Sequence, residues 1–213
     1  MAHRRRPLAL ALGLNTAVLV IEIVGGVQAN SLSLIVDGIH NVSDEAALAF
    51  LVLAYTLRTG LSSRLLRTAN LFNSLGLLAI SVFLAWRVIE RLSQPAPVMG
   101  VVPVVAGLLG AVGNWAVARV LRGPSREDVA IRLAYVHNLG DTLLSLAPVL
   151  AGLLVLVTGR SLFDPVIALG IALVIVVTTV RSIAPAHQEL LWPATVVCGH
   201  GDTSELTNDR AVR

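Results

Sequence analysis

Long apolar stretches separated by short polar turns make up most of the chain. Several of these stretches reach the roughly 18 residues that mark a membrane-spanning helix. They lack the strict alternation of a membrane β-strand, and backbone groups inside hydrocarbon must bond within their own segment, so the pattern predicts helices. Turns that contain Gly, Pro or Ser separate them. The helices are expected over residues 8–27, 32–57, 70–92, 98–121, 129–158 and 164–184.

The composition agrees with an all-α membrane protein of six transmembrane helices. Of 213 residues, 55% are hydrophobic and 14% are charged, and the mean hydropathy is +0.80. A soluble domain has about 25% charged residues, so a soluble enzyme and a disordered chain are excluded. Cys198 is the single cysteine, which excludes a disulfide scaffold. We expect an N-terminus at 1–7, one membrane domain at 8–184 and a short flexible tail at 185–213.

The distribution of arginine predicts the orientation. All 16 basic residues are Arg, and in the six-helix topology 11 of them lie on the side of the N-terminus and three on the other. Cytoplasmic loops carry an excess of basic residues. Both termini are therefore expected in the cytoplasm. The net charge of +3 follows from this topology and does not require a nucleic-acid partner.

The second and fifth predicted helices each contain a His-x-x-x-Asp step near mid-membrane: His40 with Asp44, and His137 with Asp141. Residues at i and i+4 project from one face of a helix. Ionisable groups inside a membrane are costly and usually functional. Two imidazoles and two carboxylates match the four nitrogen and oxygen ligands of zinc, and the carboxylates balance its charge. The steps predict a metal site, and no catalytic residue is assigned.

Two other interpretations remain open. A single His-x-x-x-Asp step is also compatible with a hydrogen-bonded pair that joins two helices, and two such steps would describe a structural helix bundle. An intramembrane metal-dependent enzyme would use similar ligands but keep an open coordination position for water. The sequence has no His-Glu-x-x-His step, which disfavours a metalloprotease.

Four other polar residues of the first two predicted spans are candidates for supporting or packing roles. Asp37, one turn before the first histidine, is a candidate proton relay or a hydrogen-bonding partner of another helix. Glu45 adjoins the first His-Asp step but points about 100° away, so it is a candidate to support the site or to pack helices. Asn15 and Glu22 share one face of the first helix, where packing is expected.

Residues 30–44, Asn-Ser-Leu-Ser-Leu-Ile-Val-Asp-Gly-Ile-His-Asn-Val-Ser-Asp, resemble the second-helix signature of the cation diffusion facilitator family. Residues 133–141 and Phe163-Asp-Pro165 are similar to that family's fifth helix and the start of its sixth. The likeness covers about residues 10–185. It implies a zinc transport site, with Cd²⁺, Co²⁺, Fe²⁺ or Mn²⁺ as other candidate ions. Its four residues would be His40, Asp44, His137 and Asp141.

A mechanism follows from the ligand types. Ligating histidine must be neutral and ligating aspartate ionised, so metal and protons compete for the site. Histidine has an ordinary pKa of about 6.5, so a more acidic exterior would displace zinc. This predicts a zinc/proton antiporter with alternating access. The resemblance implies export from the cytoplasm, and we expect a bacterial inner-membrane location.

The resemblance also implies a homodimer. Family members usually have a soluble dimerisation domain after the sixth helix, and about 29 residues after 184 are too few for one. We therefore expect a short subclass that dimerises through its membrane helices. Leu75, Gly76, Ile80 and Phe83 in the third predicted helix form a candidate apolar contact face.

Overall fold

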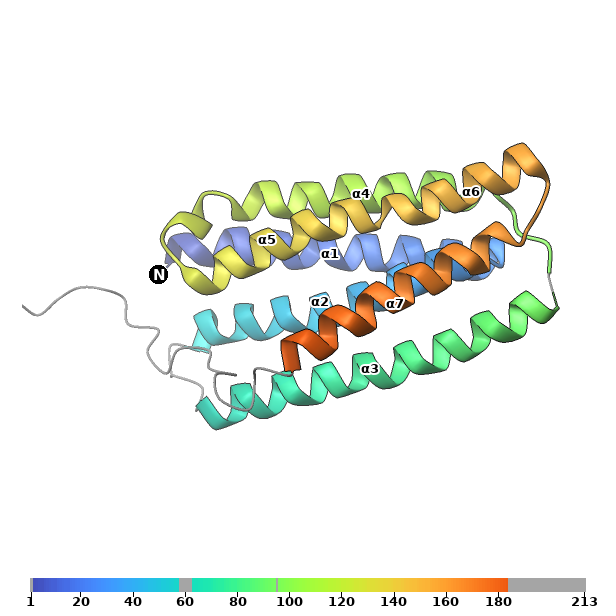
Figure 1. Ribbon diagram of the computed structural model, residues 1–213. Helices are drawn as coiled ribbons and strands as arrows, with labels where there is room; N and C mark the ends of the chain where they lie inside the picture. The colour runs from blue at the N-terminus through green and yellow to red at the C-terminus, as the bar shows by residue number, and fades with distance from the viewer. Residues whose placement is uncertain (1, 58–62, 95, 184–213) are drawn as a thin grey trace, which may run out of the picture.

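The computed structural model has the predicted all-α class. It describes residues 2–57, 63–94 and 96–183, and every regular element among them is a helix (Figure 1). The expected tail at 185–213 lies outside these residues. The elements are α1 (Ala2–Ala29), α2 (Leu32–Leu57), α3 (Ser63–Ser93), α4 (Val101–Leu121), the 3-10 helix η1 (Pro124–Arg126), α5 (Val129–Leu144), α6 (Leu146–Thr158) and α7 (Phe163–Ile183).

Helix α3 begins at Ser63, seven residues before the predicted start at residue 70. Arg64 and Arg67 lower the hydropathy of the added segment, which is why the apolar pattern missed it. Leu, Arg and Ala are all good helix formers, so the charges do not prevent helix formation. Hydropathy identified the apolar core of this helix and not its full length.

The predicted fifth helix, 129–158, is two helices in the structure. Helix α5 ends at Leu144 and α6 begins at Leu146, with Ser145 between them. Pro148 explains the break, because a proline has no N–H for the carbonyl four residues earlier and its ring clashes with that carbonyl. The prediction of one continuous helix was wrong here, although residues 130–158 still form one apolar segment.

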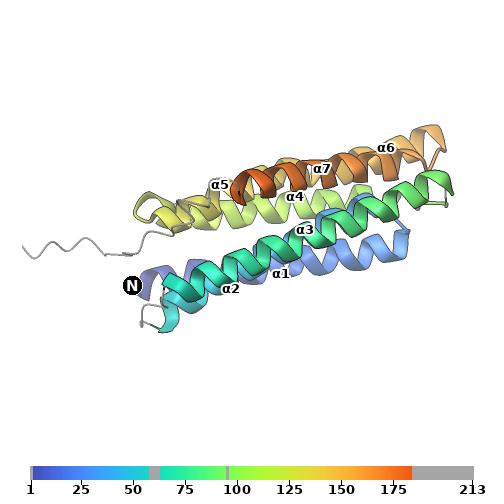
Figure 2. The same ribbon diagram turned by 60° about the horizontal axis from the view of Figure 1, so that its bottom comes forward.

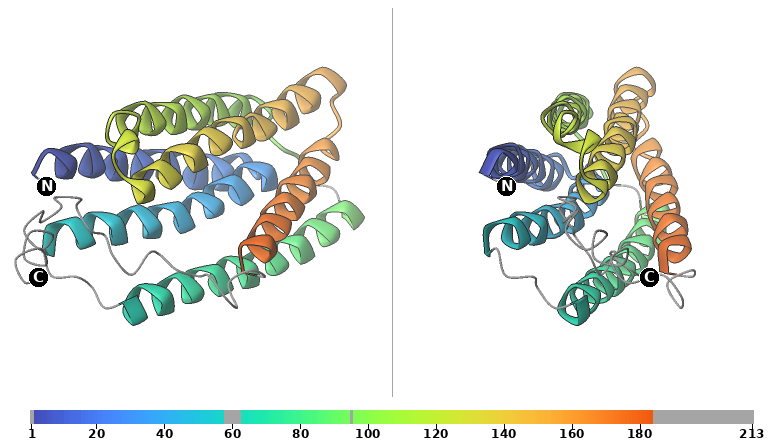
Figure 3. Two further views of the ribbon diagram at one scale, coloured as in Figure 1. Left: turned by 60° about the vertical axis from the view of Figure 1, so that its left-hand side comes forward. Right: turned by 90° about the vertical axis from the view of Figure 1, so that its left-hand side faces the viewer.

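The helices form two layers. Figure 2 shows α1, α2 and α3 in one layer and α4 to α7 in the other, and the end-on view in Figure 3 shows the same division. Helix α2 is the middle helix of the first layer, and α5 with α6 lies in the middle of the second. Helix α7 returns toward the end of the bundle where α1 begins (Figure 1). We call this the N-terminal end, and the opposite one the far end.

Two apolar clusters hold the layers together at opposite ends. At the N-terminal end, residues of α1, α2, α4 and α5 pack together: Leu8, Ala11, Leu48, Leu51, Val117, Leu121 and Ile131. At the far end, residues of α2, α3 and α7 pack together: Leu32, Val36, Leu84, Val88, Ala168, Ile171, Ala172 and Ile175. The far-end cluster therefore joins the α3–α7 pair to the remaining helices.

Asp164 of α7 caps the start of α2. Its carboxylate accepts hydrogen bonds from the hydroxyls of Ser31 and Ser33, both at 2.6 Å, and from the backbone N–H of Leu32 at 2.7 Å. The first N–H groups of a helix have no partner within the helix, and a carboxylate there also interacts favourably with the helix dipole. The buried Asp164 thus fixes α7 to α2 at the far end.

Four helical segments of the described chain are long and apolar enough to cross a membrane: Arg6–Ala29, Val101–Leu121, Ala130–Thr158 and Phe163–Arg181. Helix α2 is not among them because it contains the acidic residues Asp37, Asp44 and Glu45. Helix α3 has charged residues near both ends. The protein is an integral, multi-pass membrane protein. The orientation predicted from the arginines stays a prediction.

Candidate metal site

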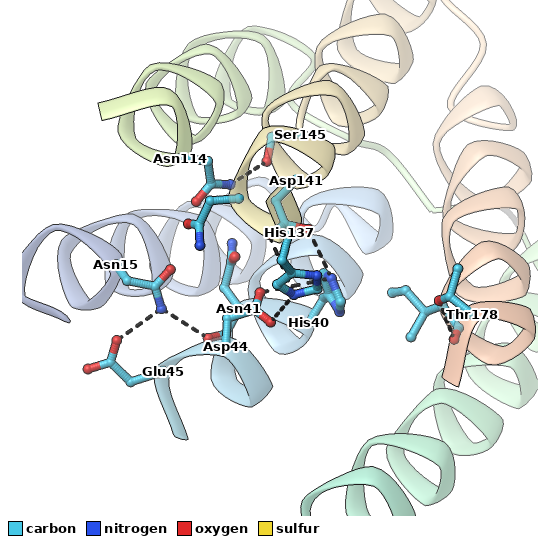
Figure 4. A network of polar contacts seen from close by, with 12 residues as sticks. Asn15, His40, Asn41, Asp44, Glu45, Asn114, His137, Asp141, Ser145 and Thr178 are labelled. Carbon is cyan, nitrogen blue, oxygen red and sulfur yellow. Dashed lines mark hydrogen bonds and ion pairs between the residues drawn. The ribbon is translucent and has the colours of Figure 1, made fainter. Parts of the chain in front are cut away.

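The two His-x-x-x-Asp steps meet between the middle helices of the two layers. His40 and Asp44 project from α2 toward His137 and Asp141 of α5 (Figure 4). One ligand atom from each of the four side chains lies within 4.8 Å of the other three. We call these four residues the His/Asp cluster. The sequence predicted the pairing within each helix, and the packing of α2 near α5 brings the two pairs together.

Each histidine is closer to the aspartate of the other helix than to its own. The Nε2 atom of His137 lies 2.6 Å from Asp44 Oδ1, and that of His40 lies 3.3 Å from Asp141 Oδ1. The distances within each helix are 3.9 Å from His40 to Asp44 and 3.6 Å from His137 to Asp141. A zinc tetrahedron with bonds near 2.0–2.1 Å has edges of about 3.3 Å. The cluster therefore has nearly the dimensions of a four-ligand zinc site.

Three of the four side chains are buried, and the fourth is half exposed. The side chains of His40, Asp44 and Asp141 are at most 10% exposed, whereas that of His137 is 49% exposed. Asp44 Oδ2 and Asp141 Oδ2 are buried and accept no hydrogen bond. Buried carboxylate oxygens without a partner are costly. A bound cation would satisfy both.

The asparagines that follow the two histidines do not have equivalent surroundings. Asn41 donates to Glu22 Oε2 of α1 at 2.5 Å, and its backbone carbonyl accepts from Asn15 at 3.3 Å. Asn138 donates to the carbonyl of Ala134 in its own helix. The polar face of α1 therefore packs, as expected, against the part of α2 that carries His40 and Asp44.

The structure separates the two candidate supporting acids. Asp37 is 1% exposed and lies next to Glu22 and the Ser145 hydroxyl, one turn beyond the cluster toward the far end. Glu45 points away from the cluster and accepts hydrogen bonds from Asn15 at 2.9 Å and from Thr16 at 2.5 Å. Glu45 thus packs α2 against α1, and Asp37 belongs to a separate polar group.

Replacing Glu45 by alanine is expected to lower stability without changing zinc affinity. Losing the hydrogen bonds to α1 should cost about 1 kcal/mol of unfolding free energy. Thermal unfolding of the purified chain in detergent measures the first effect, and calorimetric zinc titration measures the second. A loss of zinc affinity as large as that of Asp44→Ala would place Glu45 at the site after all.

Two structural features were not predicted as such. The sequence pattern placed Asp164 at the start of the last helix, but its carboxylate caps α2, 131 to 133 residues away in sequence. Ser31 and Ser33, at the start of the second helix, were the only sign in the sequence that this helix end needs a hydrogen-bond acceptor. The break at Ser145 could have been found from Pro148. It places the Ser145 hydroxyl next to Asn114, whose amide donates to it at 3.2 Å (Figure 4).

Comparison with known proteins agrees with this geometry. Residues 8–191 match the cation efflux transmembrane domain. The chain is 30% identical over 203 residues to the zinc transporter ZitB of Escherichia coli, an alignment that covers 91% of this chain and 65% of ZitB. It is 30% identical over 170 residues to the cadmium, cobalt and zinc/H(+)-K(+) antiporter of Bacillus subtilis, covering 75% of this chain and 55% of the relative.

A third relative is the metal cation efflux system protein CzcD of Cupriavidus metallidurans, 29% identical over 176 residues, or 79% of this chain and 56% of that protein. The chain thus spans between 55% and 65% of the length of these relatives. All three relatives are named for moving metal cations, and the transmembrane-domain match covers most of this chain. The protein therefore belongs to the cation efflux family, also called the cation diffusion facilitators.

Proposed function

We propose that this protein exports zinc from the cytoplasm, with His40, Asp44, His137 and Asp141 as the ligands of the transported ion. The proposal depends above all on the arrangement of the His/Asp cluster, whose ligand atoms lie within 4.8 Å of one another. Nitrogen and carboxylate oxygen are ordinary zinc ligands. The name of ZitB, a zinc transporter, supports the choice of ion, and the name of the Bacillus subtilis relative extends it to cadmium and cobalt.

Export is coupled to counter-ions in this proposal. Each histidine already contacts an aspartate, so a proton on the imidazole and a metal ion between the two helices are alternative ways to balance the same carboxylates. The Bacillus subtilis relative is named as an antiporter for protons and potassium. Zinc would leave the site as protons enter it.

In this proposal the ion enters past His137, the half-exposed residue of the His/Asp cluster. In this structure the far-end cluster and the Asp164 cap join α7 to α2, while the cluster at the N-terminal end joins α1, α2, α4 and α5. With both termini in the cytoplasm, the far end faces outward. The site would then be reached from the cytoplasm, through the His137 edge.

Zinc flux into proteoliposomes with an acidic interior tests the proposal. Uptake that follows the pH gradient supports an antiporter. Metal-dependent hydrolysis without flux would favour an intramembrane enzyme. A chain that folds equally well with and without zinc and binds none would be a structural helix bundle. Either result would overturn the transport function.

Replacing His40 or His137 by aspartate is expected to shift the preference from zinc toward manganese. A carboxylate suits harder ions better than imidazole does, and the cluster would then contain three carboxylates. We expect the ratio of zinc to manganese flux to fall by about tenfold. Competition between the two ions in the same proteoliposomes measures the ratio. An unchanged ratio would show that cavity geometry, and not ligand type, sets the selectivity.

We also propose a homodimer through α3 in a bacterial inner membrane. Leu75, Ile80 and Phe83 are exposed on the isolated chain, and nothing lies within 4 Å of a Cβ built on Gly76. This face can accept a second copy or lipid. Cross-linking in bilayers distinguishes them, because a dimer requires a cysteine placed at Gly76 to link to its counterpart, and a monomer with full flux would contradict the proposal.

A further inference from the structure

Two buried carboxyl groups lie together beyond the His/Asp cluster. Glu22 of α1 is 0% exposed and Asp37 of α2 is 1% exposed, and the two side chains are within hydrogen-bonding reach of each other. Each has an oxygen, Glu22 Oε1 and Asp37 Oδ2, that is buried and has no hydrogen-bond donor. Two carboxylates in contact inside a membrane repel each other unless a cation lies between them.

Two neutral groups complete this polar group from the other layer. Ser145, at the break between α5 and α6, lies next to Asp37, and the Asn114 amide of α4 donates to the Ser145 hydroxyl at 3.2 Å. Both are 0% exposed. Asn114 Oδ1 is a third buried oxygen without a hydrogen-bond partner. Asn114 is neutral, so the lack of hydrogen-bond partners here is not limited to the acidic side chains.

The absence of a side chain at Gly110 leaves room for these groups to approach one another. A Cβ at this position would collide with Glu22 Oε1 and lie 3.6 Å from the Ser145 Cβ. Gly110 and Asn114 are one turn apart on α4 and therefore share the face that packs on the helix break. The four oxygen-bearing side chains thus converge from α1, α2, α4 and the α5–α6 junction. We call them the oxygen cage: Glu22, Asp37, Asn114 and Ser145.

Among the described residues, no arginine contacts the two carboxyls of the cage. The donors that reach its two carboxyls are the Asn41 amide and the Ser145 hydroxyl. The other titratable groups that act on the pair are His40 and Asp141 of the His/Asp cluster. A cage of oxygen atoms without nitrogen or sulfur suits a hard cation and not zinc. Broken helices in transporters commonly coordinate coupling ions in this way.

We propose that the oxygen cage binds one monovalent cation, a proton or an alkali ion, as the counter-ion of zinc export. The inference rests on the proposed function. Asp37 lies one turn before His40, and Ser145 lies one turn after Asp141, so the nearest residues of the two sites are about 4.5–6 Å apart along the helix axes. At that distance a cation in the cage repels zinc in the cluster. Occupation of one site therefore empties the other, which couples the two ions.

The test measures coupling separately from zinc binding. The full chain in proteoliposomes is given a tenfold gradient of either protons, without alkali ions, or K⁺, at equal pH. A permeant anion at equal concentration holds the membrane potential at zero. Two quantities are measured. One is zinc–zinc exchange, which needs no counter-ion. The other is the zinc ratio, the ratio of the zinc concentrations on the two sides of the membrane at steady state. Each coupled monovalent ion multiplies that ratio by its own gradient, so losing one lowers the ratio by about tenfold.

Glu22→Gln and Asp37→Asn are expected to lower the steady-state zinc ratio by about tenfold under one of the two gradients. The gradient that shows the loss identifies the ion as the proton or as K⁺. Zinc–zinc exchange should stay within about threefold of wild type, because the cluster is intact. Glu90→Gln is the matched control, since this carboxylate is exposed and pairs with Arg87 on α3.

If the zinc ratio of the variants is unchanged under both gradients, the inference is overturned. It is also overturned if folded variants lose zinc–zinc exchange as well as zinc accumulation. If either variant does not fold, Gly110→Ala retains both carboxyls and places a methyl group against Glu22, and the same tenfold fall is expected. Wild-type protein that shows no zinc exchange would overturn the proposed function instead. The two failures are therefore distinguishable.

Discussion

Replacing Asp44 or Asp141 by alanine is expected to abolish zinc transport. Each carboxylate is buried and contacts the histidine of the opposite helix. Its loss leaves three ligands and a single negative charge to balance a doubly charged ion away from water, which is unfavourable inside a membrane. We expect zinc affinity and flux to fall by at least about 100-fold.

Zinc flux in proteoliposomes and zinc titration in detergent measure the two losses. His40→Ala and His137→Ala should also reduce transport strongly, but a water molecule can fill part of the space of a lost imidazole. The half-exposed His137 is the position where this substitution by water is easiest. Glu90→Gln serves as the control for removing a carboxylate elsewhere. Near-normal flux in either aspartate variant would contradict the assigned site.

Replacing Asp164 by alanine is expected to cause the largest loss of stability among single substitutions at the far end. Its carboxylate accepts from the Ser31 and Ser33 hydroxyls and from the Leu32 N–H, and all of these donors lose their partner together. Ser31, Ser33 and Asp164 are fully or nearly fully buried, so water cannot replace it easily. Unsatisfied buried donors should cost about 3 kcal/mol in total.

Unfolding of the purified chain in detergent micelles measures this loss. Asp164→Asn retains one acceptor oxygen and removes the charge, so it should lose less stability than the alanine variant. Ser33→Ala removes one donor and should cost about 1 kcal/mol. Equal stability of Asp164→Ala and wild type would show that the apolar far-end cluster alone holds α7 against α2.

The sequence was sufficient for the all-α class and for the pairing of His and Asp within each helix, but it missed the first turns of α3 and the break at Ser145. Apolar runs predicted the all-α class because a backbone in hydrocarbon has no other way to satisfy its hydrogen bonds than helices or closed barrels. The two His-x-x-x-Asp steps were visible because polar residues are rare in such runs. Their ligand pairs follow from the 3.6-residue helical repeat, which is a local property.

Only the tertiary structure decided which groups meet across helices. The exchange of partners, with His40 near Asp141 and His137 near Asp44, depends on how α2 and α5 pack. Spacing placed Glu45 as near to the cluster as Asp37, but the approach of α1 to α2 gave Glu45 its partners on α1.

The Asp164 cap joins residues 131 to 133 positions apart in sequence, and the oxygen cage likewise combines distant residues, from Glu22 to Ser145. Local sequence determines each helix and the face on which a polar side chain lies, because it sets the backbone hydrogen bonds and the helical repeat. Which faces meet depends on packing the whole bundle at once, through side-chain shape and the small residue Gly110 that lets Glu22 reach α4. No local pattern of residues contains that information.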